Sequence, residues 1–212
     1  MALFQRKPQT ESINLRYTLG LNKTLLLVGL GNPGKKYEGT RHNIGFQCLD
    51  RYVIDTELGD EWIAKKDLKC LYTSGTQGES KVIVIKPATF MNLSGEAVAA
   101  TMRFYKIPIE NVLVIHDELD IPFGQIRTRI GGSSAGHKGI ESILQHCGEG
   151  FSRVRIGVKA ESPLDGADFV LAKFSSEEQK HLPMLTKEAV AIISEYVYGS
   201  GKLLAETRNF MV

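Results

Sequence analysis

The sequence predicts one α/β domain built on a single mixed, mostly parallel twisted sheet, with helices on both faces in three α/β/α layers. Short, wholly apolar runs such as 25–28 and 112–115 are typical of strands buried on both faces. Segments with helical periodicity alternate with these runs, which is the pattern of α/β proteins. At 212 residues, the chain is long enough to bury a sizeable core in one domain.

Six strands are predicted in chain order, at residues 25–28, 71–76, 81–85, 112–115, 125–130 and 154–158. The second and third flank a Gly-Glu-Ser turn, which indicates a hairpin. The fifth alternates strictly in side-chain character, so Arg127 and Arg129 share one of its faces.

Helices are predicted between these strands, at residues 44–53, 96–105 and 140–146. Each places apolar side chains on one face, and we expect Asn92 and Ser94 to cap the second helix. A capping-box spacing, Ser-x-x-Glu from Ser175, predicts the start of a further helix. Pro183 is predicted to interrupt that helix before a second amphipathic segment that runs to about Tyr198.

Residues 1–23 are predicted to be an N-terminal extension, an arm or a flexible leader, and residues 24–212 the domain itself. The extension is basic, and its second half alternates apolar residues with the period of an edge strand. An organelle-targeting segment is the alternative interpretation.

Composition excludes several classes of protein. A net charge of +2 is too small to indicate nucleic-acid binding without a local basic surface. The three cysteines form no Cys-x-x-Cys pair and are odd in number, which argues against a disulfide framework or a structural zinc site. No apolar run approaches the roughly 20 residues that span a bilayer. We therefore expect a cytoplasmic protein that does not bind membranes, and the small charge favours a monomer.

The glycine-rich segment Gly29-Leu30-Gly31-Asn32-Pro33-Gly34 follows the first strand and fits the G-x-G-x-x-G dinucleotide fingerprint. That fingerprint requires a helix that begins within the motif and faces a pyrophosphate. Here the helix begins only near Thr40 or later, so nucleotide binding is disfavoured. The glycines are instead interpreted as permitting backbone angles that other residues resist.

His42 and Asp117 are the candidates for acid–base chemistry. A carboxylate bound to one imidazole nitrogen fixes the tautomer and leaves the other nitrogen free as a base. His42 lies where a helix begins, and Asp117 follows the strand 112–115 in the sequence His-Asp-Glu-Leu-Asp. The alternatives are a histidine that caps or packs at a helix end, and a solvated acidic turn or divalent-metal site at Asp117, Glu118 and Asp120.

Two further loops carry polar groups. Asn92, in the segment that begins at Phe90, is interpreted as a helix cap or as an amide that donates to an oxyanion or a peptide main chain. The loop 131–139 is rich in glycine and serine and precedes a helix, where phosphate binding is favourable. An ordinary surface loop is its alternative interpretation.

Taken together and in order, these motifs resemble the bacterial-type peptidyl-tRNA hydrolase family. The likeness runs from about residue 25 to at least residue 174. The motifs that carry it are Gly-Leu-Gly-Asn-Pro-Gly from Gly29, Thr-Arg-His-Asn from Thr40, Thr-Phe-Met-Asn-Leu-Ser-Gly from Thr89, His-Asp-Glu-Leu-Asp from His116 and Gly-His-x-Gly from Gly136.

The resemblance implies cofactor-independent hydrolysis of the ester that joins a peptide to the 3′-terminal ribose of tRNA, with no metal. His42 would be the base that activates water, and Asp117 its orienting partner. Asn32 and Asn92 would hold the peptide main chain and the reacting carbonyl.

The same resemblance implies a set of substrate and tRNA contacts. Tyr37 and Asn43 would line the site, and the basic positions would meet the phosphates of the acceptor stem and 3′ end. The full set is Tyr37, Asn43, Phe90, His137, Lys138, Arg129 and Arg155.

Two residues depart from the family pattern. Lys138 replaces the asparagine of Gly-His-Asn-Gly, and a lysine cannot accept a hydrogen bond. Ser134 stands where many members carry a second histidine. The sequence therefore leaves an alternative to hydrolysis, a catalytically weakened family member that acts as an RNA-binding factor.

Overall fold

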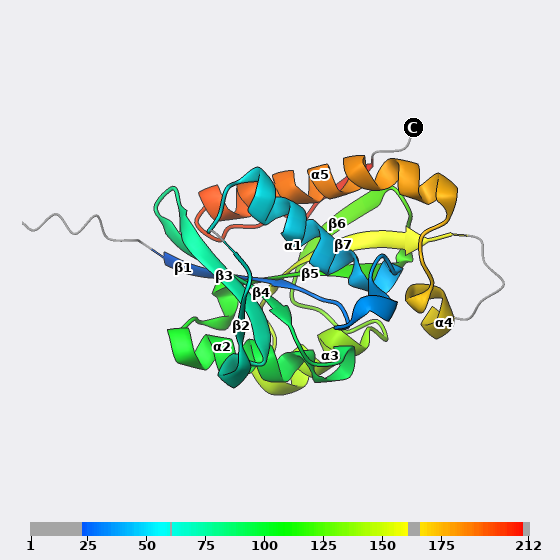
Figure 1. Ribbon diagram of the computed structural model, residues 1–212. Helices are drawn as coiled ribbons and strands as arrows, with labels where there is room; N and C mark the ends of the chain where they lie inside the picture. The colour runs from blue at the N-terminus through cyan, green and yellow to red at the C-terminus, as the bar shows by residue number, and fades with distance from the viewer. Residues whose placement is uncertain (1–22, 60, 161–165, 210–212) are drawn as a thin grey trace, which may run out of the picture.

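The computed structural model describes residues 23–59, 61–160 and 166–209. These residues form one eight-stranded sheet in the order β2-β3-β4-β1-β5-β7-β6-β8 (Figure 1). The strands are β1 (Lys23–Gly29), β2 (Ile63–Lys65), β3 (Cys70–Gln77), β4 (Ser80–Pro87), β5 (Val112–Pro122), β6 (Gln125–Ile130), β7 (Ser152–Lys159) and β8 (Thr207–Asn209).

Five α-helices accompany the sheet in this part of the chain: α1 (Ile44–Asp55), α2 (Ser94–Tyr105), α3 (Lys138–Cys147), α4 (Gly166–Leu171) and α5 (Ser176–Tyr198). Single 3₁₀ turns include η1 (Lys35–Tyr37), η2 (Arg41–Asn43) and η4 (Met91–Leu93). None of these helices has both the length and the apolar character needed to cross a membrane. The predicted N-terminal extension lies outside the described residues, except for Lys23, which begins β1.

The single mixed sheet and the α/β class are confirmed. The four central strands β4, β1, β5 and β7 pair in parallel, and antiparallel strands extend the sheet on both sides. The expectation of a mostly parallel sheet applies only to this centre. Of the seven pairings in the described chain, three are parallel and four antiparallel, because β2, β3, β6 and β8 all join through antiparallel ladders.

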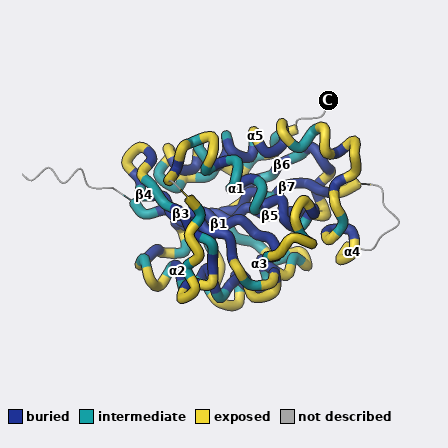
Figure 2. The backbone as a smooth tube through the Cα atoms, viewed as in Figure 1, coloured by how far each residue is buried: buried dark blue, intermediate teal, exposed yellow. Residues whose placement is uncertain are grey.

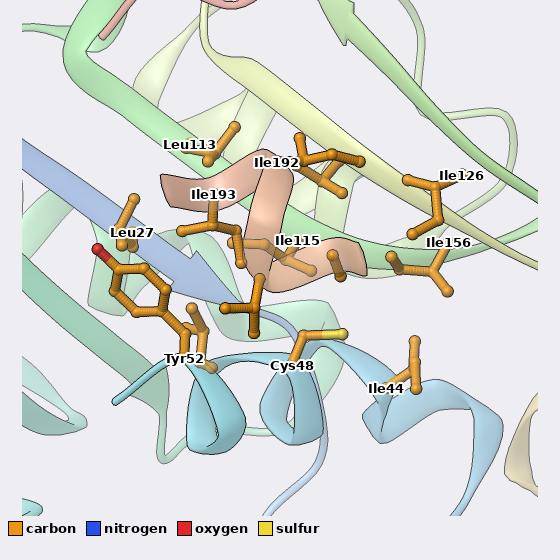
Figure 3. Close-up of a cluster of buried hydrophobic side chains, with 14 of the residues drawn as sticks. Leu27, Ile44, Cys48, Tyr52, Leu113, Ile115, Ile126, Ile156, Ile192 and Ile193 are labelled. Carbon is orange, nitrogen blue, oxygen red and sulfur yellow. The ribbon is translucent and has the colours of Figure 1, made fainter. Parts of the chain in front are cut away.

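Helices cover both faces of the sheet, as predicted. Helices α1 and α5 lie on one face, and α2 and α3 lie on the other (Figure 1). Figure 2 shows the buried central strands between helices whose outer surfaces are exposed. Successive residues of β1 point to opposite faces, so Leu27 packs under α1 and α5 while Leu26 and Val28 pack under α2 and α3. Figure 3 shows the first of these clusters, where Cys48 and Tyr52 of α1 face the sheet.

Strand β5 is longer than predicted. The apolar run ends at Ile115, but residues 116–118 continue the parallel ladder with Arg155, Ile156 and Gly157 of β7. The acidic motif therefore lies inside the strand, and the alternative interpretation as a solvated acidic turn is wrong. Strand β1 ends opposite Ile115. The second half of β5 therefore extends beyond the end of β1, and its polar side chains lie next to the glycine-rich loop.

Two predictions about helix ends are also wrong. Helix α2 begins at Ser94 with no side-chain cap, so neither Asn92 nor Ser94 caps it. Helix α5 runs through Pro183 without interruption. Beyond Pro183, the helix buries Leu185, Ala189 and Ile193 against the sheet. We infer that this burial outweighs the hydrogen bond that a proline cannot donate.

The glycines of the first loop serve close packing more than unusual backbone angles. A Cβ on Gly45 would lie 2.6 Å from the amide nitrogen and 2.7 Å from the carbonyl oxygen of Leu30, and it would also meet the Ile115 carbonyl. A Cβ on Gly29 would lie 2.5 Å from the Gly45 carbonyl oxygen. Of the three fingerprint glycines, Gly34 alone has a positive φ, of 103°. The interpretation that all three permit special backbone angles is therefore wrong for Gly29 and Gly31.

Substitution of Gly45 by alanine is expected to lower stability, because the three atoms nearest to the new Cβ all belong to backbone that cannot move aside. Overpacking of this kind costs about 1–3 kcal/mol, which for a domain of this size lowers Tm by roughly 2–4 °C per kcal/mol. Thermal unfolding followed by circular dichroism measures the change. Gly166→Ala is the matched control, because its nearest contact is the end of the flexible Leu119 side chain at 3.1 Å. Equal Tm values for the two variants would contradict this account.

Candidate active site

A cavity of about 500 Å³ opens where the loops after β1 and β4 meet β5, the start of α3, and α4. Its polar lining comes from segments far apart in the sequence: Asn32, His42, Asn92, Asp117, Glu118, His137 and Lys138. Its apolar lining includes Phe90, Met91, Leu119, Val170 and Leu171. The structure thus brings the four predicted catalytic residues to one cavity, together with three of the predicted contact residues.

The carboxylate of Asp117 is the centre of this site. Its Oδ1 lies 2.9 Å from Nδ1 of His42 and 3.0 Å from Nε2 of His137, and its Oδ2 lies 3.0 Å from Nδ1 of His42. The Asp117 side chain is 2% exposed, and the two imidazoles remain accessible from the cavity at 12% and 7%. One buried carboxylate therefore accepts hydrogen bonds from two histidines.

The backbone of α3 fixes the tautomer of His137. Its Nδ1 faces the amide nitrogens of Gly139 and Ile140, at 3.1 and 3.3 Å, and an amide N–H can only donate. Nδ1 is therefore the acceptor, and Nε2 carries the hydrogen that it donates to Asp117. His137 is thus both the N-cap of α3 and a support for the carboxylate.

The same reasoning assigns the hydrogen of His42. An ionised carboxylate can only accept, so Nδ1 of His42 donates to Asp117, and in the neutral imidazole Nε2 is the acceptor. Burial by itself raises the pKa of the Asp117 carboxyl, but the electrostatic interactions and hydrogen bonds with His137 and His42 outweigh it and hold the pKa well below its usual range. Asp117 is therefore ionised, and the free nitrogen of His42 can act as a base.

A third histidine lies behind the pair. His116 is buried, and burial lowers its pKa well below the ordinary value, with a further contribution from His137. Its Nδ1 donates to the carbonyl oxygen of Asp117 at 2.7 Å, and its ring packs edge-on against His137 at a centroid distance of 4.9 Å. A neutral His116 therefore adds no competing charge beside the carboxylate.

Asn32 is held from two sides. The backbone amide of Met91 donates to Oδ1 of Asn32 at 2.8 Å, and this contact identifies which side-chain atom of Asn32 is the oxygen. The Nδ2 group is therefore the atom that does not face Met91. The side chain of Asn43 hydrogen-bonds both the backbone nitrogen and the backbone oxygen of Asn32, at 2.8 and 2.9 Å. Asn43 is 5% exposed and does not line the cavity. It lies behind the site, where it orients Asn32.

The remaining predicted contact residues lie at different depths. Asn92 is exposed and lines the cavity. Phe90 is 55% exposed at the same rim, and its ring meets the Tyr37 ring edge-on at a centroid distance of 6.4 Å. Tyr37 itself does not line the cavity.

Four arginines share one face of the neighbouring strands β6 and β7. Arg127 pairs in register with Arg155, and Arg129 with Arg153. Nε of Arg155 lies 3.1 Å from Glu118, so this arginine is already neutralised. Burial, with Arg129 and Arg155 nearby, lowers the pKa of Arg153 to about 10. Arg129 is exposed and has no hydrogen bond or ion pair within the described chain, so it is the group most available to an anion.

Lys138, the residue that departs from the family pattern, begins α3 at the cavity rim. Its ammonium lies 3.0 Å from Glu141, and its side chain is 68% exposed. The positive charge therefore projects toward solvent rather than into the His42–Asp117 pair.

The structure argues against metal binding at these groups in the observed geometry. His42, Asp117 and His137 are the cluster with suitable spacing in the described chain. To ligate through Nε2, however, a neutral His137 would need its hydrogen on Nδ1, where two amide N–H groups already point. The acidic set considered from the sequence does not converge, because Glu118 faces Arg155 and Asp120 is exposed.

A mixed α/β sheet with a carboxylate-oriented histidine and amide groups in one cavity is the arrangement of a hydrolytic enzyme. A family profile described as "Peptidyl-tRNA hydrolase" matches residues 26–210. The chain belongs to the peptidyl-tRNA hydrolase family.

Individual relatives agree. The peptidyl-tRNA hydrolase of Geobacter metallireducens is 45% identical, over 82% of this chain and 89% of its own. A chloroplastic peptidyl-tRNA hydrolase of Arabidopsis thaliana is 37% identical, over 99% of this chain and 71% of its own. The crystal structure of peptidyl-tRNA hydrolase from Acinetobacter baumannii superimposes with a TM-score of 0.77 at 34% identity, covering 84% of this chain and 90% of that one.

Sequence reasoning missed two features of the site. The first is the wall formed by α4, whose short sequence gives little periodicity. The second is the buried pair of Arg41 and Glu178, at 2.6 Å. The position of Arg41 directly before His42, and the place of Glu178 in the predicted capping box, were the available signals.

Replacement of Asp117 by asparagine is expected to lower kcat by roughly 10²–10⁴. An amide of the same shape places a donor where Oδ2 now lies 3.0 Å from Nδ1 of His42, and it has no negative charge to stabilise the imidazolium. Steady-state hydrolysis measures kcat, and binding of deacylated tRNA serves as the control, since Asp117 is not predicted to contact RNA. An unchanged kcat would refute the assigned role.

The low pKa of Asp117 also predicts a pH dependence of stability. The folded state holds this pKa below the unfolded value of about 3.9, so the carboxylate stabilises the fold fully above that value and loses its contribution as pH falls below it. The difference in unfolding free energy between wild type and Asp117→Asn should be constant from about pH 5 to 7 and shrink below about pH 4. Urea unfolding across this range tests it, and a difference that grows on acidification would contradict it.

Proposed function

We propose that this chain hydrolyses the ester between the peptide and the 3′-terminal ribose of peptidyl-tRNA, without a cofactor. The observation that carries the proposal is the buried Asp117 carboxylate that binds Nδ1 of His42 within an accessible cavity. Membership of the family supplies the substrate class.

In the proposed reaction, Nε2 of His42 takes a proton from water, and the water oxygen attacks the ester carbonyl carbon. The tetrahedral intermediate then breaks its bond to the ribose 3′-oxygen, which receives the proton back from His42. Asp117 stabilises the imidazolium that forms between these steps. His137 keeps Asp117 in place throughout.

The side-chain amides supply donors for the acyl part of the substrate. With its Oδ1 engaged by Met91, Asn32 presents Nδ2 to the peptide main chain or to the developing oxyanion. Asn92 is a second amide donor that lines the same cavity. Asn43 contributes through Asn32, and the rings of Tyr37 and Phe90 form an edge against which the 3′-terminal ribose and its base pack.

The basic residues bind the phosphates of the tRNA. Arg129 and Lys138 are exposed and meet phosphates of the acceptor stem and 3′ end, which gives affinity without sequence preference. Arg155 contributes to the same positive surface while its pairing with Glu118 holds it in position.

We further propose that the protein acts as a monomer in the cytoplasm. The small net charge and the unpaired cysteines support this assignment. An organelle is the alternative, since the chloroplastic relative matches 99% of the chain. Fluorescent fusions with and without residues 1–23 distinguish the two, and light scattering gives the mass in solution.

An RNA-binding factor that has lost hydrolysis is the second candidate function. The observation that favours it is Lys138 at the position of the family's asparagine. An asparagine amide both donates and accepts hydrogen bonds, whereas a lysine ammonium only donates. Release of N-acetyl amino acid from tRNA, measured for wild type and Lys138→Asn, decides between the two. An inactive wild type that gains hydrolysis with Lys138→Asn would favour the binding factor.

Substitution of His42 by alanine is expected to reduce hydrolysis by roughly 10²–10⁴, because the base is lost. The same assay with excess EDTA should leave wild-type activity unchanged. Activity that survives His42→Ala would overturn the mechanism, and activity abolished by EDTA would restore the metal interpretation.

Replacement of Lys138 by asparagine is expected to raise KM for peptidyl-tRNA and to lower the salt dependence of log KM by about 0.7, one phosphate contact on a single strand. Lys180→Asn is the matched control, since Lys180 forms the same i, i+3 ion pair on α5 and is 69% exposed, but lies outside the cavity lining. Equal effects of the two substitutions would show that Lys138 makes no specific contact.

A further inference from the structure

Arg41 precedes His42 in η2, yet its guanidinium points away from the cavity. Its side chain is 6% exposed, and Nη2 lies 2.6 Å from Oε2 of Glu178, at the start of α5. Nη1 donates to the carbonyl oxygen of Lys173 at 2.7 Å. The guanidinium of Arg41 therefore binds the segment that joins α4 to α5.

Two aromatic rings enclose the same guanidinium. Its central carbon lies 4.1 Å from the ring centroid of Phe169 and 5.2 Å from that of Phe174. The backbone adds to this contact, because the amide of Arg41 donates to the carbonyl oxygen of Ala172 at 3.1 Å. A planar cation with several donors can satisfy all of these partners, whereas a lysine ammonium cannot.

Glu178 connects this contact to the helix behind it. Its Oε2 also accepts from the backbone nitrogen of Ser175 at 2.6 Å, and the Ser175 hydroxyl accepts in turn from the backbone nitrogen of Glu178. The carboxylate thus caps α5 and binds Arg41 with the same oxygen. Loss of either partner leaves a buried charge without its counterion, which is strongly unfavourable.

The segment held by Arg41 adjoins α4, which forms one apolar wall of the cavity. Val170 and Leu171 of α4 line it, while Phe169, between Asp168 and Val170, packs on Arg41. Helix α4 has six residues and packs mainly on η2, so its position depends on that turn. The cations Lys138 and Arg129 belong to α3 and β6, which leaves the α4 wall for the peptide part of the substrate.

We propose that Arg41 is a positioning residue that sets the α4 wall relative to His42, and thereby determines how well the enzyme holds an apolar side chain next to the ester. This inference rests on the proposed function. It assigns specificity for the acyl residue to a buried ion pair that does not touch the substrate.

The test compares two substrates on the same tRNA, N-acetyl-phenylalanyl and N-acetyl-glycyl esters, for wild type, Arg41→Lys and Glu178→Gln. A displaced wall affects the phenylalanyl ester, and a misplacement of about 1 Å can cost roughly 100-fold. We expect kcat/KM for the phenylalanyl ester to fall about 10–100-fold more than for the glycyl ester. Affinity for deacylated tRNA should be unchanged.

Arg208→Lys is the matched control, because Arg208 also binds glutamates of α5, Glu188 and Glu195, but lies outside the cavity lining. It should leave the ratio of the two kcat/KM values as in wild type. Phe169→Leu is a second variant, for use if Arg41→Lys fails to fold. It keeps both charges and removes one ring, so it should also lower kcat/KM for the phenylalanyl ester relative to the glycyl ester.

An equal loss for both esters in every folded variant would overturn the inference, because a merely structural role lowers the amount of active enzyme without changing the ratio. A wild type that hydrolyses neither ester would instead refute the proposed function. The two failures are therefore distinguishable in the same experiment.

Discussion

The buried carboxylate of Asp117 is the interaction on which the rest of the site depends. A charge at this depth is stable only when it is fully hydrogen-bonded, and two imidazole N–H groups satisfy it. His137 can donate to it only because the first amides of α3 occupy its other nitrogen. The protonation pattern of the pair is thus fixed by helix geometry, through a chain that runs from α3 to His137, then Asp117, and then His42.

This chain requires that distant segments approach closely. Strand β5 continues past the end of β1, and the glycine-rich loop begins against it, with the amide of Leu30 donating to the carbonyl oxygen of Ile115 at 2.9 Å. Helix α1 begins directly against Leu30 and Ile115, where there is no room for a Cβ on Gly45. Gly29 and Gly31 of the fingerprint therefore allow α1 to pack closely against the end of β1. In a dinucleotide site, the glycines would instead allow a phosphate to approach the start of a helix.

Local patterns in the sequence were sufficient for most of the fold and for the members of the site. The apolar runs and the hairpin signal predicted strands correctly, because burial determines both pattern and structure. They failed at His116, where a strand continues through polar residues whose partners lie on β7, and at Pro183, where burial of the helix face prevails over a missing N–H. The dual role of His137 and the pairing of Arg41 with Glu178 depend on contacts across 20 and 137 positions, which no local pattern contains.

The turn η2 orients three side chains of the site, because its residues Arg41, His42 and Asn43 point in three different directions. A 3₁₀ turn has about three residues per turn, so successive side chains diverge by roughly 120°. Arg41 points to the α4–α5 segment, His42 to Asp117, and Asn43 to the backbone of Asn32. One turn therefore joins the peptide wall, the base and the amide donor, and each of the three contacts restrains the other two. A continuous α-helix from Thr40 would separate successive side chains by about 100° and would lose this threefold arrangement. The irregular start of α1 is accordingly part of the site, because it orients all three groups at once.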